Sequence, residues 1–373
     1  MSLTTAFRTA RSVLGAFAAM GVVWGTFGAD LPDIKTMLGV DESRLGLLLF
    51  MTPIAAMLAM VATPWIGAAL GRNALPVAAL VMALAFLLPG QVGVWYLFPL
   101  AMLACGAATG ATDVLMSARA SMIEGASGRP LMNLTHAAYS FGYGAAAIAT
   151  GVLRSYGWGP GAVFPLMALV AVPLALWCFA ASEPIKGLGR SVGGGGLGWV
   201  PVIGGGIVLI AFLTENATEI WSALHIEKTL HGSPALGSLG PASMALTMGV
   251  ARLAGQGIAQ RIDGVRLLMG GAVLASAGVL TAALAVSPAM AYAGFIVMGV
   301  GASVISPTAF TRVGAMVAPE ARTKAVARAT LLGYFGYFVG PPVLGFIAGA
   351  FGLRAALGCA ADRKSTRLNS SHG

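Results

Sequence analysis

Long apolar stretches separated by short polar turns dominate the chain. Each stretch is long enough to cross the roughly 30 Å of bilayer hydrocarbon, which takes about 20 helical residues. Because no water reaches the backbone there, such a stretch must satisfy its own hydrogen bonds as a helix does. The pattern predicts an all-α polytopic membrane protein with spans near 11–30, 44–70, 74–92, 94–118, 131–153, 161–181, 199–219, 237–259, 267–286, 290–312 and 325–350.

The spans fall into two sets with matching local sequences. Residues 35–39 (KTMLG) recur as 228–232 (KTLHG), and the Phe-Gly-Tyr triplet at 141–143 recurs at 335–337. We therefore interpret the chain as a six-plus-six duplication. The predicted units are an N-terminal half at 1–181, a cytoplasmic glycine-rich linker at 182–198 and a C-terminal half at 199–361, with five helices and the start of a sixth.

The end of the chain departs from this pattern. After Arg354 only 355–361 is apolar, which is too short to cross a bilayer. The segment 362–373 resembles translated vector or adapter sequence. We expect a C-terminal truncation that lacks the twelfth helix, with a non-native tail at 362–373. A non-functional fragment is one alternative that follows from this interpretation.

Composition and charge agree with a membrane location. Charged residues make up 9% of the chain and the mean hydropathy is +0.84, whereas soluble domains carry about 25% charged residues. The net charge of +9 comes from Lys and Arg in turns, so no nucleic-acid partner is expected. Most basic residues share the side of the N-terminus and the central linker, which predicts that side to be cytoplasmic. On the opposite side lie Lys35, Arg44, Arg154, Lys228 and Arg354.

Four short segments carry a resemblance to a known family. They are 24–32 (WGTFGADLP), 110–114 (GATDV), 132–136 (MNLTH) and 221–224 (WSAL). With the six-plus-six pattern, they make the chain resemble the major facilitator superfamily, and within it the fucose-permease-like branch of sugar:proton symporters. The resemblance covers most of the chain. It implies paired halves around a midplane site, a bacterial inner membrane location, and a monomer without cofactor or metal.

The resemblance also assigns gating residues to the cytoplasmic turns. Arg72 marks the turn after the second span, and Arg252, Arg261, Asp263 and Arg266 mark the corresponding region of the second half. The first turn carries one Arg and no acid, which departs from the family pattern. Arg252 lies inside a span, where it pairs with a carboxylate, contacts an anionic substrate or extends to the cytoplasmic face.

Asp113 is the first candidate for proton coupling. It lies within a span, where an ionised carboxylate costs about 2.5–3.5 kcal/mol on insertion scales. Helical spacing puts it on one face with Thr109 and Met116, so we expect it to point into the bundle. The resemblance places an acidic proton-coupling residue at this position. The alternative is a carboxylate that only bonds neighbouring threonines.

Two further acids are candidates for the same role. The resemblance matches Asp30 to a second acidic position of the branch, and the alternative is a helix-end carboxylate beside Asp33. Glu215 lies one turn from Glu219, and two close carboxylates disfavour double ionisation, so one of them is expected to hold a proton. A solvated helix end is the alternative there. Trp221 is interpreted as an interfacial belt residue.

The predicted substrate-binding residues are polar or aromatic positions of the fifth and eleventh spans: Asn133, His136, Tyr139, Ser140, Tyr143, Tyr334 and Tyr337. The repeat places Ala327 and Thr330 opposite Asn133 and His136, so this polar cluster belongs to one half, as a substrate site can. A buried neutral histidine and aromatic residues that only pack are the alternatives.

The sequence as a whole predicts a proton-coupled secondary transporter of a small polar solute, with a sugar favoured and symport as the default. Drug or organic-solute efflux by proton antiport is the alternative within the same class. An intramembrane enzyme is the rival class, and it requires a nucleophile or metal cluster that we do not find in the sequence. We therefore expect no enzymatic activity.

Overall fold

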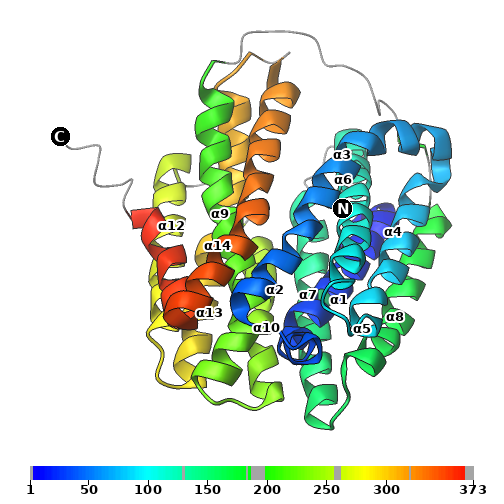
Figure 1. Ribbon diagram of the computed structural model, residues 1–373. Coiled ribbons are helices and arrows are strands. Elements are labelled where there is room, and N and C mark those ends of the chain that lie inside the picture. Colours follow the sequence, from blue (N-terminus) through cyan, green and yellow to red (C-terminus); the bar gives the residue numbers. More distant parts are fainter. Residues whose placement is uncertain are drawn as a thin grey trace.

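A computed structural model describes residues 3–127, 131–181, 184–185, 198–255, 262–318 and 321–365. The described chain is built from helices and connecting turns (Figure 1). The elements are α1 (Leu3–Leu38), α2 (Glu42–Leu49), α3 (Met51–Leu70), η1 (Gly71–Asn73), α4 (Ala74–Ala85), α5 (Leu88–Gln91), α6 (Phe98–Ser127), α7 (Met132–Ser155), α8 (Pro160–Trp177), η2 (Cys178–Ala181), α9 (Val200–Leu224), η3 (His225–Thr229), α10 (Pro234–Ala254), α12 (Gly264–Ala283), α13 (Pro288–Ala315) and α14 (Arg322–Ser365).

Within the described residues, helix covers most of each of the eleven predicted spans. The prediction of an all-α membrane protein is therefore confirmed. Eight helical stretches are long and apolar enough to cross a membrane by length and composition, among the described residues. One of these, Glu42–Gln91, contains two predicted spans, which are separated by a turn at Gly71 with a positive φ of 56°. Helices α7 and α10 are not among the eight stretches, and both carry polar residues that face the site described below.

Helices α1 to α8 lie on one side of the molecule and α9 to α14 on the other (Figure 1). Within the first group, α1 packs against α7 and α8, and α3 packs against α6. Within the second group, α9 packs against α14, and α12 packs against α13. Helices α7 and α10 contact each other between the groups, as do α2 and α14. The cavity described below lies between these two sets of helices.

The internal repeat is visible in the local structure of two turns. Gly39 and His231 both adopt a left-handed backbone, with φ of 63° and 55°, and they are 192 residues apart (231 − 39). Two residues after each, Asp41 and Ser233 accept a hydrogen bond from the backbone N–H three positions on and so cap α2 and α10. The two segments with matching sequences thus have the same kind of turn and the same kind of helix cap.

Large apolar side chains cover the outside of the helix bundle. Leu58, Trp65, Leu169 and Phe351 are each between 66% and 77% exposed. A water-facing surface with so many exposed apolar side chains is a liability, whereas lipid solvates them. These positions mark the surface that faces the hydrocarbon.

The last helix of the described chain bends where the eleventh predicted span ends. Gly352 has φ of 84° and ψ of 166°, and the helix continues beyond it to Ser365. Leu353 and Leu357 of this final segment are buried. The predicted tail, 362–373, is thus helical in its first four residues, and 366–373 lie outside the described residues.

Candidate functional site

A cavity of about 210 Å³ lies between the two groups of helices. At the 10–15 Å³ that one water requires, it has room for on the order of ten waters, which matches the heavy atoms of a small solute. Its walls come from α1, α3, α6 and α7 on one side and from α9, α10 and α14 on the other. Both halves therefore contribute to one site.

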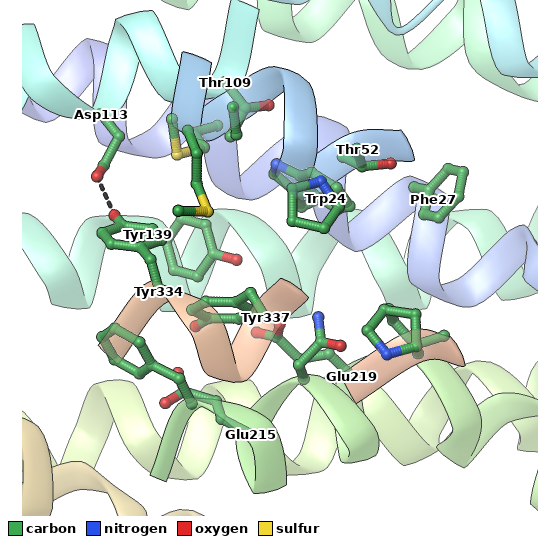
Figure 2. Close-up of a pocket in the computed structure, with 18 of the residues that line it drawn as sticks. Trp24, Phe27, Thr52, Thr109, Asp113, Tyr139, Glu215, Glu219, Tyr334 and Tyr337 are labelled. Carbon is green, nitrogen blue, oxygen red and sulfur yellow. Dashed lines mark hydrogen bonds between the residues drawn. The ribbon is translucent and has the colours of Figure 1, made fainter. Parts of the chain in front are cut away.

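Asp113 contributes a carboxylate to this cavity from the middle of α6. Its helical neighbours Thr109 and Met116 also line the cavity, as the 3.6-residue period predicts. The hydroxyl of Tyr334, from α14, donates a hydrogen bond to the Asp113 Oδ2 atom (Figure 2). This bond joins the two groups of helices across the cavity.

Two further carboxylates line the cavity from α9, on the side away from Asp113 (Figure 2). Glu215 and Glu219 are one helical turn apart, which aligns them on one face. The Arg252 Nη2 atom lies 3.9 Å from the Glu215 Oε1 atom, and Arg252 Nη1 donates to the Ser140 Oγ atom at 3.4 Å. Arg252 thus points into the cavity and not along the helix to the cytoplasmic face.

Aromatic side chains make up much of the remaining wall. Phe212 and Tyr337 have ring centroids 4.8 Å apart, and Tyr334 lies 6.0 Å from Tyr337. On the opposite wall, the His136 ring meets Phe17 edge-on at 5.0 Å, and Trp24 also lines the cavity. The site therefore combines flat apolar surfaces with a small number of charged groups, as small-molecule sites do.

The structure brings together part of the predicted substrate set. His136, Tyr139, Tyr334 and Tyr337 line the cavity, but Asn133, Ser140 and Tyr143 do not. Ser140 is buried behind the wall, where it accepts the bond from Arg252. The Tyr143 hydroxyl donates to the Glu219 carbonyl oxygen at 3.4 Å and so connects α7 to α9.

A second charged cluster lies beyond one end of the cavity, on the side predicted to face outward. The Arg154 guanidinium is fully buried and donates to both oxygens of Asp33 at 2.7 and 2.8 Å. It also donates to both oxygens of Glu227 at 2.7 and 3.0 Å, and to the Ala29 carbonyl at 2.8 Å. These bonds use all five guanidinium N–H groups. Asp33 and Arg154 come from the first group of helices and Glu227 from the second, so the cluster joins the halves.

Asp30 belongs to this same cluster and not to the central cavity. Its side chain is fully buried, and its Oδ1 atom lies 3.3 Å from the Arg154 Nε atom. Neither Asp30 oxygen has a hydrogen-bond partner among the described residues. The alternative of a helix-end carboxylate does not fit the structure, because α1 continues eight residues beyond Asp30, to Leu38.

Close helix contacts occur on the same outer side of the cavity. A Cβ atom on Gly46 of α2 would lie 2.6 Å from the Pro341 carbonyl oxygen of α14. A Cβ atom on Gly151 of α7 would lie 2.5 Å from the Ser238 Cβ atom of α10. Both distances are shorter than real Cβ contacts, so these glycines permit the two halves to touch.

Arg154 and Glu227 are functional candidates that the sequence interpretation missed. Arg154 was interpreted only as a basic residue of an outer turn, and Glu227 carried no prediction. The π-helical turn η3, which carries Glu227, directs that residue back towards α7, and such turns are frequent at functional sites. The sequence does contain one weak indication of this cluster. Asp30 and Asp33 lie close together at one end of a span, and two neighbouring carboxylates there favour a basic partner.

The predicted gating turns are only partly within the described residues. Arg72 lies exposed in η1 and Arg266 lies exposed in the first turn of α12, whereas Arg261 falls outside the described residues. Asp263 caps α12 and accepts from the backbone N–H groups of Arg266 and Val265, and these bonds hold the pKa of Asp263 below its usual range. The Asp263 Oδ1 atom lies 3.8 Å from the Arg312 Nη1 atom.

The structure contradicts the predicted position of Trp221. Trp221 is fully buried in the helix bundle, so its interpretation as an interfacial belt residue is wrong. Its helix, α9, lies in the interior between α14, α10 and α13, which leaves this face of α9 without contact to lipid. Among the described residues, His, Cys, Asp and Glu form no group of three or more that could hold a metal ion.

Comparison with known sequences gives a consistent result. A family model described as the Major Facilitator Superfamily matches residues 205–361. An uncharacterised MFS-type transporter of Yersinia pestis is 33% identical over 352 residues, which covers 93% of this chain and 90% of the relative. Membrane protein MosC of Rhizobium meliloti is 27% identical over 350 residues, which covers 94% of this chain and 86% of MosC.

Comparison with solved structures identifies the same fold at lower sequence identity. The nucleoside transporter NupG superposes with a TM-score of 0.76 at 13% identity, covering 97% of this chain and 98% of NupG. A bacterial homologue of the human lysosomal transporter Spinster, in an inward-facing and occupied conformation, gives a TM-score of 0.69 at 14% identity, covering 98% of this chain and 94% of that protein.

Proposed function

This chain belongs to the major facilitator superfamily, and we propose that it moves a small organic solute across a bacterial inner membrane by alternating access. The moving units are the two halves, 1–181 and 199–361, joined by the linker 182–198. We place the N-terminus and the linker in the cytoplasm, in keeping with the basic residues on that side, and propose that the chain works as a monomer.

The observation that carries the proposal is a cavity lined by both halves with a buried ion cluster beyond one end. A solute in this cavity touches both halves at once, so movement of one half against the other changes the side from which it is reached. The Arg154 cluster and the close contacts at Gly46 and Gly151 support a conformation closed on the outer side. We therefore assign this conformation as the inward-facing one.

Proton coupling is the second part of the proposal, with Asp113 as its main carrier. Its hydrogen bond to Tyr334 joins α6 to α14. Loss or gain of a proton at Asp113 changes that bond, and so changes the free-energy difference between conformations. Asp30 and Glu215 remain proposed as further proton sites, Asp30 acting through the outer cluster. A proton that moves inward gains about 2.3 kcal/mol per 100 mV of membrane potential.

The proposed substrate-binding residues are those that line the cavity: His136, Tyr139, Tyr334 and Tyr337. Their flat rings and polar tips suit a sugar-like solute, and Asn133, Ser140 and Tyr143 are proposed to support the wall from behind. Efflux by proton antiport is retained as a second candidate, because three carboxylates line this cavity together with one guanidinium.

Proteoliposomes that contain a trapped pH-sensitive dye test this function. A panel of sugars, nucleosides, organic acids and amines is added outside, and the internal pH is recorded for each solute. The proposal expects at least one solute to move protons in the wild type, and Asp113→Asn to abolish this movement while solute binding persists. Undiminished proton movement in Asp113→Asn would exclude the proposed role of Asp113.

A further inference from the structure

The carboxylates that line the central cavity outnumber its cationic groups. The lining contains Asp113, Glu215 and Glu219, and of its described residues only Arg252 is a Lys or Arg. The Asp113 carboxylate accepts a hydrogen bond from Tyr334. The Glu219 carboxylate accepts a hydrogen bond from the Tyr139 hydroxyl of α7. When all three carboxylates are ionised, the cavity carries an excess of negative charge that burial makes costly.

The wall beside the α9 pair is aromatic. Phe212 lies three residues before Glu215 on α9, and its ring is 5.8 Å from Tyr334 and 4.8 Å from Tyr337. Aromatic faces attract a cation through the negative charge on their π surface, and the attraction is larger where water is excluded. The carboxylate pair and the rings therefore favour the same kind of ligand, one that is positively charged and partly apolar.

The same geometry disfavours an anionic solute. Arg252 is the cationic group of the lining, and it already lies near Glu215 and donates to Ser140. A solute carboxylate beside Arg252 would come close to Glu215 and leave the negative charge of the cavity larger than before. A neutral sugar would bond to the polar groups but leave that charge to be neutralised by protons.

We propose that the transported solute is a small organic cation, an amine or quaternary ammonium, held by Glu215 and Glu219 against the aromatic wall of the cavity. This inference rests on the proposed function and adds the chemical class of the substrate to it. It departs from the sugar-like solute that the sequence favours.

Competition between solute and protons follows from this assignment. The charged and titratable groups that face the α9 pair are Arg252 from α10, Tyr139 and Tyr143 from α7, and Tyr337 from α14. Two carboxylates one turn apart are neutralised either by a proton or by a cation. Binding of the cation thus displaces a proton, which is the exchange that an antiporter requires.

Thermal unfolding of the purified chain in detergent tests whether the cavity prefers a cationic solute, with two matched pairs of probes. Phenyltrimethylammonium is compared with benzenesulfonate, which has the same number of heavy atoms and the opposite charge. Glucosamine is compared with glucose, from which it differs by one ammonium group. We expect both cations to raise the unfolding temperature by mass action, with Kd values about tenfold or more below those of their partners.

Variants locate the effect at the α9 pair. We expect the double variant Glu215→Gln/Glu219→Gln to weaken phenyltrimethylammonium binding by about tenfold or more. Glu42→Gln is the matched control, because its carboxylate pairs with Lys35 within one half and away from the cavity. Phenyltrimethylammonium cannot titrate, so its tighter binding at about pH 8 than at about pH 6 reports protons on the protein. The same comparison of binding at the two pH values in His136→Gln shows whether the histidine that lines the cavity contributes to the pH dependence.

A measurement on the wild type covers the case in which the double variant does not fold. Addition of phenyltrimethylammonium to the protein in weak buffer should release protons, and addition of benzenesulfonate should not. Tighter binding of benzenesulfonate or glucose, the absence of any stabilisation by the cations, or no proton release would each overturn the cation assignment. If glucose alone drove proton movement, the cation assignment would be wrong but the transporter function would stand. If no solute drove proton movement, the proposed function itself would be rejected.

Discussion

Replacement of Glu227 by Gln removes a carboxylate that joins Arg154 to the second half of the molecule. Loss of one partner from a buried ion pair costs about 3–5 kcal/mol when the other charge is left alone. Arg154 keeps its two bonds to Asp33, and Gln keeps one acceptor oxygen. The loss is therefore close to that of one hydrogen bond between charged groups, about 1.5–3 kcal/mol.

This loss destabilises only the conformation in which the outer side is closed, because only there do Arg154 and Glu227 meet across the halves. At 1.4 kcal/mol for each factor of ten, the ratio of outward-open to outward-closed molecules should rise by about ten- to 100-fold. A residue that opening exposes should become accessible in proportion, until the open form dominates.

Ser238 provides the reporter for this assay. It is fully buried in α10 against Gly151 of α7, and Ser238→Cys changes one atom. The background carries Cys359→Ser, since Cys105 and Cys178 are buried and Cys359 is exposed. The rate of labelling by a membrane-impermeant maleimide added from outside is measured with and without Glu227→Gln.

Glu42→Gln is again the matched control, because it removes an outer carboxylate that does not join the halves. The expected result is a labelling rate about tenfold or more higher in Glu227→Gln and unchanged in Glu42→Gln. Equal rates in Glu227→Gln and the wild type, with both folded by size-exclusion chromatography, would refute the assignment of Arg154 and Glu227 as an outer closure.

Three further predictions concern the central contact, a close helix approach and an exposed cap. Tyr334→Phe keeps the ring that lines the cavity but should alter the pH dependence of solute-driven proton movement, because Asp113 loses its donor; an unchanged pH profile in the dye assay would speak against that link. Gly151→Ala should favour the outward-open form, measured as faster labelling of a cavity cysteine from outside, whereas Gly206→Ala, whose added Cβ atom would meet no atom within 4 Å, should not. Asp263→Asn should lower the unfolding temperature at neutral pH. The pKa of Asp263 is lower in the folded chain, so its stabilisation is present above about pH 4 and lost as the pH falls through the pKa of the folded state; a gap between variant and wild type that does not shrink as the pH is lowered from about 4 would contradict this.

Hydropathy and helical period made much of the fold predictable. The spans are set by the need to satisfy backbone groups in lipid, which depends on local sequence alone. The same reasoning put Thr109, Asp113 and Met116 on one face of one helix, and all three line the cavity. The helical period determines which face a residue occupies. An acidic side chain within a span faces the bundle interior because its exposure to lipid is costly.

Contacts between distant helices were not predictable in the same way. Arg154 and Glu227 are 73 residues apart, and nothing local distinguishes them from ordinary turn charges. Asp30 resembled a proton site by position, but its partner became visible only once α1 and α7 were packed together. The prediction for Trp221 was wrong for a related reason. Hydropathy does not tell whether one face of a helix contacts lipid or the interior of the bundle.

Alternating access requires that the central cavity be reached from one membrane face at a time. Thr109→Cys in the cysteine-depleted background places a reporter in the cavity wall, and impermeant maleimide is applied to right-side-out and inside-out vesicles. We expect labelling from the cytoplasmic face in the otherwise wild-type chain. In Glu227→Gln we expect faster labelling from outside and slower labelling from the cytoplasmic face. Equal labelling from both faces in both proteins, or from neither, would contradict alternating access through this cavity.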